Sequence, residues 1–230
     1  MKTIPLFFLI LSLNSYAQTV ASVKKLIPNF GQVDNKGLVY RGKQPKKVGA
    51  VEALAKFGIT DVIVFKNDVH GEVVSELTEL ETNSIASYNI PFKWKDIDFN
   101  ESCLQVVEAL NIIQNVTKAQ GKVFFHCTAG EDRTGLLAGV YRMITEKIST
   151  QEAFEKEMCA KGYSDGNPGK FGMVSGPIQK GLTPLFLSFA GRIESGKLKA
   201  GKISKTLCKD FKLEPTTLTC KKSAEFFKNY

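Results

Sequence analysis

Apolar residues occur along this chain in two patterns, short continuous runs and longer stretches with helical spacing. The run from Val62 to Phe65 is typical of a strand buried on both faces. Apolar positions three or four residues apart, as around Leu110, indicate amphipathic helices. We predict strands over residues 38–40, 61–65, 85–90 and 122–125, and helices over residues 48–57, 72–81, 102–117, 134–147, 150–161 and 184–194.

The order of these elements predicts the fold class. Strands that alternate with helices favour an α/β fold, with a mostly parallel central sheet flanked by helices. Ser102 is the expected N-terminal cap of the long helix. Residues 162–176 are rich in Gly, Pro, Asn, Asp and Ser and are predicted to form a loop.

The N-terminal segment has the pattern of a secretory signal peptide. Lys2 precedes an apolar run over residues 4–13, which is too short to span a bilayer comfortably. Ser15 and Ala17 place small residues at the −3 and −1 positions of a cleavage site. We expect cleavage after Ala17 and export to the periplasm or the medium; a buried N-terminal helix is the alternative. No later segment is apolar enough for a membrane span.

The charge is concentrated at the other end of the chain. The formal net charge is +8, and residues 197–230 hold nine lysines against three acidic residues. We therefore divide the chain into a signal peptide (1–17), a main folded domain (18–196) and a Lys-rich tail or appendage (197–230). A basic balance points to an anionic partner. The tail lacks the regularly interleaved aromatics of many nucleic-acid binders, so we expect no nucleic-acid partner.

The five cysteines bear on both redox state and chemistry. An exported protein keeps disulfides, and an odd number of cysteines leaves at least one thiol unpaired in the chain. We expect Cys127 to stay reduced. Cys208 and Cys220 close a short loop and form the expected pair, with five free thiols as the alternative. Cys103 and Cys159 fall at helix core positions, where buried free cysteine is common.

The chemistry is concentrated in a short segment between the strand at 122–125 and the following helix. Five residues separate Cys127 from Arg133, which allows the backbone to curl into a nest whose N–H groups point inward and bind phosphate. The helix that begins at Thr134 adds its positive N-terminal end. That field lowers the pKa of a thiol at this position, so Cys127 is expected to be a thiolate nucleophile.

Each neighbour of Cys127 has an expected role. Arg133 offers a planar fork for two phosphate oxygens, and Thr134 donates a hydrogen bond to the sulfur. His126 orients the loop through backbone contacts. The remaining loop residues line the substrate phosphate; they are Thr128, Ala129, Gly130, Glu131 and Asp132.

The motif His126-Cys127-x5-Arg133-Thr134 resembles the signature of the protein tyrosine phosphatase superfamily, in its small dual-specificity-like branch. Residues 40–45, Tyr-Arg-Gly-Lys-Gln-Pro, resemble a stretch near the start of many bacterial members. The resemblance covers residues 40–142. It implies a parallel-sheet α/β fold and a two-step reaction through a phosphocysteine, with no metal and no cofactor.

The resemblance also implies a general acid on a loop about thirty residues before the cysteine. Asp98 lies 29 residues before Cys127 and is the preferred candidate, and Asp96 lies 31 residues before it. A positioned acid of this kind contributes about 10²–10⁴-fold to the rate. Asp132 is a third candidate, although we expect it to tie the loop to backbone or to Arg41.

The stretch Lys66 to Gly71 bears on the substrate. It resembles an Arg-x-Glu-Ser-His-Gly stretch of the phosphatase-like phytases, with Lys66 and His70 in register. That group is exported and hydrolyses inositol polyphosphates, which makes a phosphorylated small molecule the leading substrate class. A phosphoprotein is the alternative, and a polar surface connection is the plainer interpretation of the stretch. Further lysines that could face the pocket are Lys43, Lys93, Lys95 and Lys170.

Two other hypotheses belong to different functional classes. A non-catalytic phosphate-binding module would not need the cysteine, the arginine and an upstream aspartate together. A rhodanese-like sulfurtransferase also uses a cysteine loop, but the Arg133-Thr134 ending favours a phosphatase.

Overall fold

The computed structural model describes residues 20–209 and 218–220. The signal-peptide interpretation (1–17) and most of the tail beyond residue 209 lie outside the described residues. Five strands form one sheet in the order β1-β2-β5-β3-β4. The edge strand β1 (Gly31–Gln32) runs antiparallel to β2 (Val39–Lys43), whereas β2, β5 (Val123–Cys127), β3 (Asp61–Val64) and β4 (Ala86–Asn89) are parallel. This arrangement confirms the predicted α/β class.

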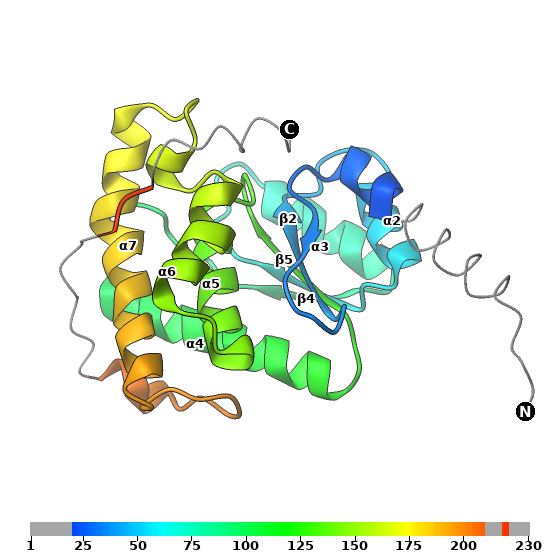
Figure 1. Ribbon diagram of the computed structural model, residues 1–230. Helices are drawn as coiled ribbons and strands as arrows, with labels where there is room; N and C mark the ends of the chain where they lie inside the picture. Colours follow the sequence, from blue (N-terminus) through cyan, green and yellow to red (C-terminus); the bar gives the residue numbers. More distant parts are fainter. Residues whose placement is uncertain (1–19, 210–217, 221–230) are drawn as a thin grey trace, which may run out of the picture.

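Helices cover both faces of the sheet (Figure 1). On one side lie α2 (Ala50–Phe57) and α3 (Glu72–Thr82). On the other lie α4 (Phe99–Lys118), α5 (Asp132–Glu146), α6 (Thr150–Ala153) and α7 (Gly172–Glu194). After α6 the chain continues through a π-helical turn η1 (Phe154–Met158) and two 3₁₀ turns, η2 (Cys159–Lys161) and η3 (Ser164–Gly166). A last 3₁₀ turn, η4 (Lys205–Cys208), follows α7.

Alternation along the central strands divides the core into two layers. Ile63 and Phe125 pack with the layer under α4, α5 and α7, and Val64 and Phe124 pack with the layer under α2 and α3. Because strand residues point alternately to opposite faces, an uninterrupted apolar run supplies both layers. The short edge strand β1 gives no such signal and is not predicted from the sequence.

Two helices begin earlier than their sequence pattern indicates. The long helix α4 begins at Phe99, capped by Asp98 rather than by Ser102. The last helix α7 begins at Gly172, inside the predicted loop, and contains Pro177 and Pro184. Buried side chains on α7 such as Ile178 hold this stretch helical, so tertiary packing overrides its low intrinsic propensity.

Four cysteines form two disulfides, Cys103–Cys208 and Cys159–Cys220. The predicted Cys208–Cys220 pair is therefore wrong, as is the expectation that Cys103 and Cys159 are free. The segment before η4 docks on α4, where Asn111 exchanges hydrogen bonds with the backbone of Ile203 at 2.9 Å in each direction. This docking carries Cys208 to Cys103, and proximity in the sequence does not reveal it.

Among the described residues, no helix is both long and apolar enough to cross a bilayer. The same part of the chain contains no cluster of three or more His, Cys, Asp or Glu side chains arranged to hold a metal ion.

Candidate active site

The Cys127 loop connects the end of β5 to the start of α5, at the carboxyl edge of the parallel strands. Cys127 is aligned with Lys43 at the end of β2. Gly130 has φ +73°, and a Cβ atom there would lie 2.3 Å from the carbonyl oxygen of Gly42. Only glycine combines this backbone conformation with so close an approach.

The thiol of Cys127 is almost completely buried, with 2% of the residue exposed. Burial raises its pKa, but the positive charge of Arg133 and hydrogen bonding from Thr134 outweigh that effect, so the pKa lies below its usual value of 9.0. The backbone N–H of Cys127 donates to Thr134 Oγ1 at 2.8 Å, which fixes the threonine beside the sulfur. The predicted thiolate is therefore supported by its surroundings.

The guanidinium of Arg133 is held from two sides. Its Nη1 donates to the carbonyl oxygen of Phe92 at 2.9 Å, and its Nη2 donates to Thr128 Oγ1 at 3.0 Å. Within the described part of the chain, the buried Nε–H has no acceptor. The side chain is thus positioned in advance, with a donor left for an anion.

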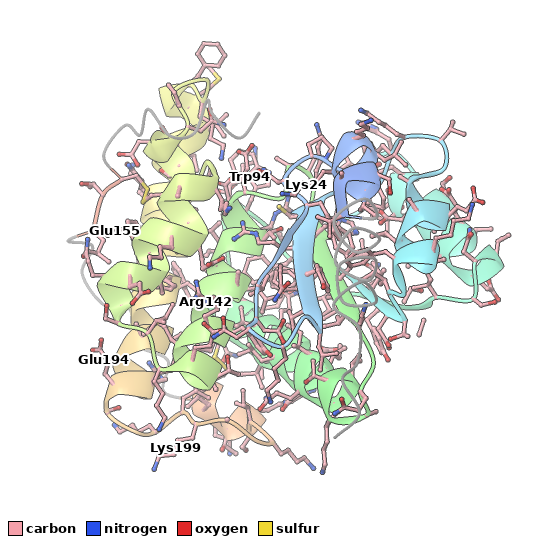
Figure 2. All side chains as sticks on the ribbon, turned by 45° about the vertical axis from the view of Figure 1, so that its right-hand side comes forward. Lys24, Trp94, Arg142, Glu155, Glu194 and Lys199 are labelled. Atoms are coloured by element: carbon pink, nitrogen blue, oxygen red, sulfur yellow. A yellow bond between two sulfur atoms is a disulfide. The ribbon has the colours of Figure 1, made fainter. Side chains whose placement is uncertain are left out.

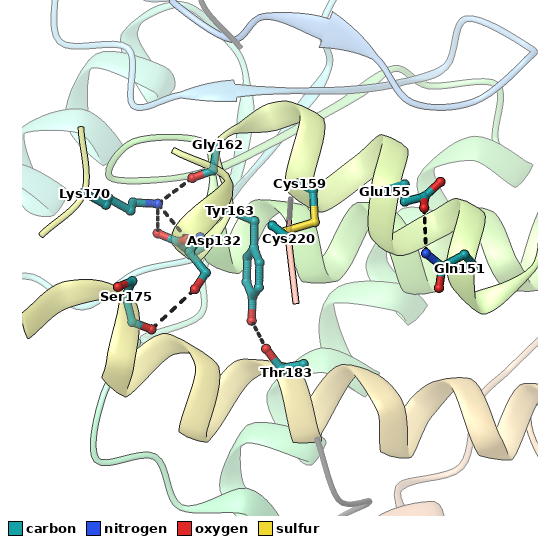
Figure 3. Close-up of a disulfide and its surroundings, with 11 residues drawn as sticks. Asp132, Gln151, Glu155, Cys159, Gly162, Tyr163, Lys170, Ser175, Thr183 and Cys220 are labelled. Carbon is teal, nitrogen blue, oxygen red and sulfur yellow. Dashed lines mark hydrogen bonds and ion pairs between the residues drawn. A yellow bond between two sulfur atoms is a disulfide. The ribbon is translucent and has the colours of Figure 1, made fainter. Parts of the chain in front are cut away.

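Charged side chains hold the loop from outside. Lys170 Nζ lies 2.7 Å from Glu131 Oε2. It also lies 2.7 Å from Asp132 Oδ1 and donates to the carbonyl oxygen of Gly162 at 2.7 Å (Figure 3). The backbone N–H of Ser164 donates to Asp132 Oδ1 at 2.9 Å. Asp132 therefore ties the loop to backbone and to Lys170, not to Arg41. The expectation that Lys170 is a pocket cation is not supported, because two carboxylates neutralise it.

Arg41 binds the loop from the β2 side. Its Nη2 donates to the carbonyl oxygen of Gly130 at 3.0 Å, and its Nη1 donates to the carbonyl oxygen of Glu157 at 2.6 Å. Arg41 therefore links the phosphate loop to the π-helical turn η1.

A cleft of about 550 Å³ opens beside the loop, next to Thr128 and Arg133. Trp94 lies in its wall, near the upper end of the strands in Figure 2, and the ammonium of Lys95 sits 5.5 Å from the centre of the Trp94 ring. The other lining residues are Lys66, Asn67, Val69, His70, Glu72, Lys93 and Asp96. A larger hollow, of about 760 Å³, lies by Asp34, Leu38 and Tyr141 and contains none of the predicted site residues.

The two candidate acids differ sharply in their surroundings. Asp98 is the N-cap of α4: its Oδ1 accepts from the backbone N–H of Asn100 at 2.9 Å and of Glu101 at 3.0 Å, and it does not line the cleft. Asp96 lines the cleft and has φ +49°, a left-handed conformation that aspartate tolerates better than most residues. The geometry therefore brings Asp96, not the preferred Asp98, to the phosphate loop.

The Lys66 to Gly71 stretch forms one wall of the cleft, but Lys66 is not a free cation. It is 2% exposed, and its Nζ contacts Glu72 Oε1 at 2.5 Å and Gln44 Oε1 at 3.2 Å. The hydrogen bond from Lys66 lowers the pKa of Glu72 to about 2. His70 lines the cleft, and its backbone N–H donates to Glu72 Oε2 at 2.8 Å.

His126 is completely buried, and its Nδ1 lies 3.2 Å from the carbonyl oxygen of Cys127. This position supports the expected role in orienting the loop. Sequence reasoning missed its other contact, Glu76 on α3, whose Oε1 lies 2.7 Å from His126 Nε2. A charged residue among the apolar positions of α3 was the available signal.

Comparison with known proteins places this site in a family. The catalytic-domain model of the dual specificity phosphatases matches residues 39–158, just over half of the chain. The chain belongs to this family. The match spans the whole loop and both of its flanking elements, so residues 39–158 form a catalytic domain of the dual specificity phosphatase type.

Curated relatives agree over shorter segments. Dual specificity protein phosphatase 1-A of Xenopus laevis is 29% identical over 87 residues, which make up 36% of this chain and 24% of that protein. Dual specificity protein phosphatase 1 of Homo sapiens is 40% identical over 48 residues, 21% of this chain and 13% of that protein. The chain thus spans about a quarter or less of the length of these relatives.

Solved structures share the fold at lower identity. A mutant form of Tk-PTP superposes with a TM-score of 0.55 at 21% identity, covering 73% of this chain and 97% of that chain. The core catalytic domain of PP-IP phosphatase SIW14 from S. cerevisiae gives a TM-score of 0.51 at 20% identity, covering 66% and 84%. These similarities support the architecture of the sheet and its covering helices.

Proposed function

We propose that this protein is an exported phosphatase that removes phosphate from myo-inositol polyphosphates. The observation that carries the proposal is the composition of the cleft. Lys93, Lys95 and His70 line it directly beside Thr128 and Arg133. A ligand with several phosphates would place one in the loop and its neighbours against the ammonium groups of Lys93 and Lys95 and the ring of His70.

The contacts at the loop support a two-step reaction. The Cys127 thiolate attacks phosphorus and forms an S–P bond while the ester P–O bond breaks. Asp96 gives a proton to the departing oxygen. Water then attacks the phosphocysteine, Asp96 takes up a proton from it, and phosphate leaves as the thiolate is restored. Arg133 binds the phosphoryl oxygens throughout, and Thr134 stabilises the sulfur as a leaving group.

The shape of the cleft suits a compact ring with charged substituents. Trp94 offers a flat wall, and Lys95 lies over its ring. Glu72 also lines the cleft, but its charge is already paired with Lys66 and therefore does not neutralise Lys93 or Lys95. The S. cerevisiae neighbour is described as a PP-IP phosphatase, which is consistent with such a substrate, although the likeness at 20% identity concerns the fold.

Two observations support export. The N-terminal residues have the pattern of a signal peptide. Four cysteines are paired as disulfides, which persist in oxidising compartments such as the periplasm. Cys127 is the one cysteine left as a thiol, as the reaction requires.

A phosphotyrosyl or dual-specificity protein substrate is the second candidate. The apolar part of the same cleft favours it, since Val69 and Trp94 lie beside the cations and Val69 is 67% exposed. A phosphotyrosine ring could rest against these side chains.

Phosphate release from myo-inositol hexakisphosphate, lower inositol phosphates and a phosphotyrosyl peptide, at equal ionic strength, separates the two candidates. The decisive variant is Lys93→Ala/Lys95→Ala, and its matched control is Lys199→Ala/Lys202→Ala, which removes the same charge from an exposed surface. We expect a several-fold rise in KM for inositol phosphates in the first variant only, with p-nitrophenyl phosphate unaffected. A preference for the peptide, or equal effects of both variants, would contradict the proposal.

A further inference from the structure

A buried ion pair lies directly behind the Cys127 loop. Glu76 on α3 and His126 on β5 are 5% and 0% exposed, and Glu76 Oε1 lies 2.7 Å from His126 Nε2. In the described part of the chain, neither atom makes a hydrogen bond, so each depends on this ion pair for compensation of its burial. An unprotonated carboxylate and an unprotonated ring nitrogen would repel at this distance, so at least one of the two groups is protonated.

The contacts around the pair indicate where that proton sits. The carbonyl oxygen of Cys127 can only accept, so Nδ1 of His126 carries a hydrogen. Lys66 can only donate, which directs the Gln44 amide oxygen toward it and the Gln44 Nε2 toward Glu76 Oε2, at 2.8 Å. Glu76 thus accepts a hydrogen bond at Oε2 from the Gln44 amide. A carboxylate whose Oε1 faces a protonated Nε2 of His126 is compatible with all of these contacts.

We propose that Glu76 is a positioning residue for the phosphatase reaction: it holds His126 as a doubly protonated imidazolium whose Nδ1–H binds the carbonyl oxygen of Cys127. The imidazolium fixes the end of β5 and places a positive charge behind the sulfur. The charge adds to that of Arg133, which already lowers the pKa of the Cys127 thiol.

Within the described residues, the ionisable groups that reach the pair through Gln44 or through the loop are engaged with other partners. Lys66 and Glu72 lie beyond Gln44 and neutralise each other, while Arg133 and Asp132 act on Cys127 from the loop side. In the sheet, His126 is aligned with Gly42 on β2 and Val64 on β3, neither of which ionises. Glu76 is therefore the charged group that contacts the His126 ring directly.

The position of Glu76 on its helix is consistent with this role. The buried residues of α3 are Val73, Glu76 and Leu80. The carboxylate of Glu76 therefore lies on the buried, otherwise apolar face of this helix. An unpaired charge there would be costly to bury, whereas an imidazolium partner compensates it.

The first test needs no mutation. The chain has two histidines, His70 and His126, so nitrogen NMR of ¹⁵N-histidine-labelled protein gives two ring systems. We expect the buried ring to carry protons on both nitrogens at about pH 8, where a solvated imidazole is neutral. His70, which is exposed, serves as the internal reference. A neutral tautomer for His126 at that pH would overturn the proposal.

The second test measures the consequence for Cys127. Glu76→Gln keeps the shape of the side chain but leaves His126 neutral, and Glu79→Gln, on the exposed face of the same helix, is the matched control. The rate of iodoacetamide alkylation against pH reports the pKa of the Cys127 thiol. Loss of a positive charge raises that pKa, by about one pH unit, and thus slows alkylation about ten-fold on the acid side. Glu79→Gln should follow the wild type.

An alkylation profile for Glu76→Gln that coincides with the wild type would overturn the proposal. Should Glu76→Gln fail to fold, Glu76→Asp retains the carboxylate and should preserve both the doubly protonated ring and the alkylation profile; a neutral ring in that variant would contradict the pairing. The proposal rests on Cys127 as the nucleophile and not on the inositol substrate. Neither readout requires turnover, so a failure of the substrate proposal is distinguishable from a failure here.

Discussion

Removal of the Cys159–Cys220 disulfide is expected to disturb the position of the phosphate loop and to lower the stability of the fold. Cys159 directly follows the turn η1, whose Glu157 accepts from Arg41. The same segment continues to Ser164, which donates to Asp132 in the loop. Figure 3 shows the disulfide beside the Lys170–Asp132 contact. The bond therefore fastens the segment that holds the loop from outside.

The loss of stability follows from the length of chain that each bridge closes. The sequence separations are 61 residues for Cys159–Cys220 and 105 for Cys103–Cys208. The chain-entropy relation gives about 4 and about 5 kcal/mol at 25 °C for the two bridges. For a protein of this size either loss lowers Tm by on the order of 10 °C. Stability alone thus hardly distinguishes the two bridges.

Activity should distinguish them. We compare Cys159→Ser/Cys220→Ser with Cys103→Ser/Cys208→Ser, which removes the bridge between α4 and η4. Calorimetry selects a temperature at which both variants are folded, and kcat/KM for p-nitrophenyl phosphate is measured there. We expect a loss of roughly ten-fold or more in the first variant, because small displacements of positioned groups reduce rates strongly. The second should retain wild-type activity.

The reasoning fails if both folded variants have wild-type kcat/KM. The segment that contacts Arg41 through Glu157 and the loop through Ser164 would then keep its position without the disulfide. It fails equally if the Cys103–Cys208 variant alone loses activity.

Other predictions concern individual residues of the site. Cys127→Ser should abolish turnover yet still bind inorganic phosphate by calorimetry, because the nest of N–H groups survives; residual turnover near wild type would remove the nucleophile assignment. Asp96→Asn should slow phosphate esters with poor leaving groups far more than p-nitrophenyl phosphate, and equal losses on both would assign the acid elsewhere. Asp98→Ala should instead cost about 1 kcal/mol of stability in denaturant unfolding through loss of the α4 cap, with little change in kcat; a large kcat loss would return the acid role to it. Gly130→Ala should eliminate phosphate binding, as its Cβ would clash with Gly42, and retained binding would contradict the loop geometry.

The parts of the fold that follow from local sequence were predictable. The apolar runs at 61–65 and 122–125 place the central strands because burial on both faces leaves no polar positions. Cys127, Arg133 and Thr134 belong to one short loop whose geometry depends on neighbours in the chain. Their spacing was therefore sufficient to predict a phosphate site.

The functions of acidic residues were harder to assign from sequence. Asp98 is followed three positions later by Glu101, a spacing typical of helix N-termini, and this pattern could have identified the cap. Glu76 stands out at an apolar position of its helix, but its partner His126 lies 50 residues away. Only the packing of α3 against the sheet brings the two together.

Long-range pairings were not predictable. Cys103 meets Cys208 because Asn111 docks the backbone of Ile203 on α4. From the sequence, Lys66 is expected to be a cation that faces the pocket, but in the structure Glu72 neutralises its charge. Both outcomes depend on contacts that sequence spacing does not encode.

The most direct test of the central claim is to trap the covalent intermediate. The purified protein is mixed with substrate, quenched in acid during turnover, digested, and analysed by mass spectrometry. The account predicts one phosphoryl group on the peptide that contains Cys127, and none on that peptide in Cys127→Ser. A phosphoryl group on another residue, or steady turnover without any phosphorylated Cys127, would contradict it.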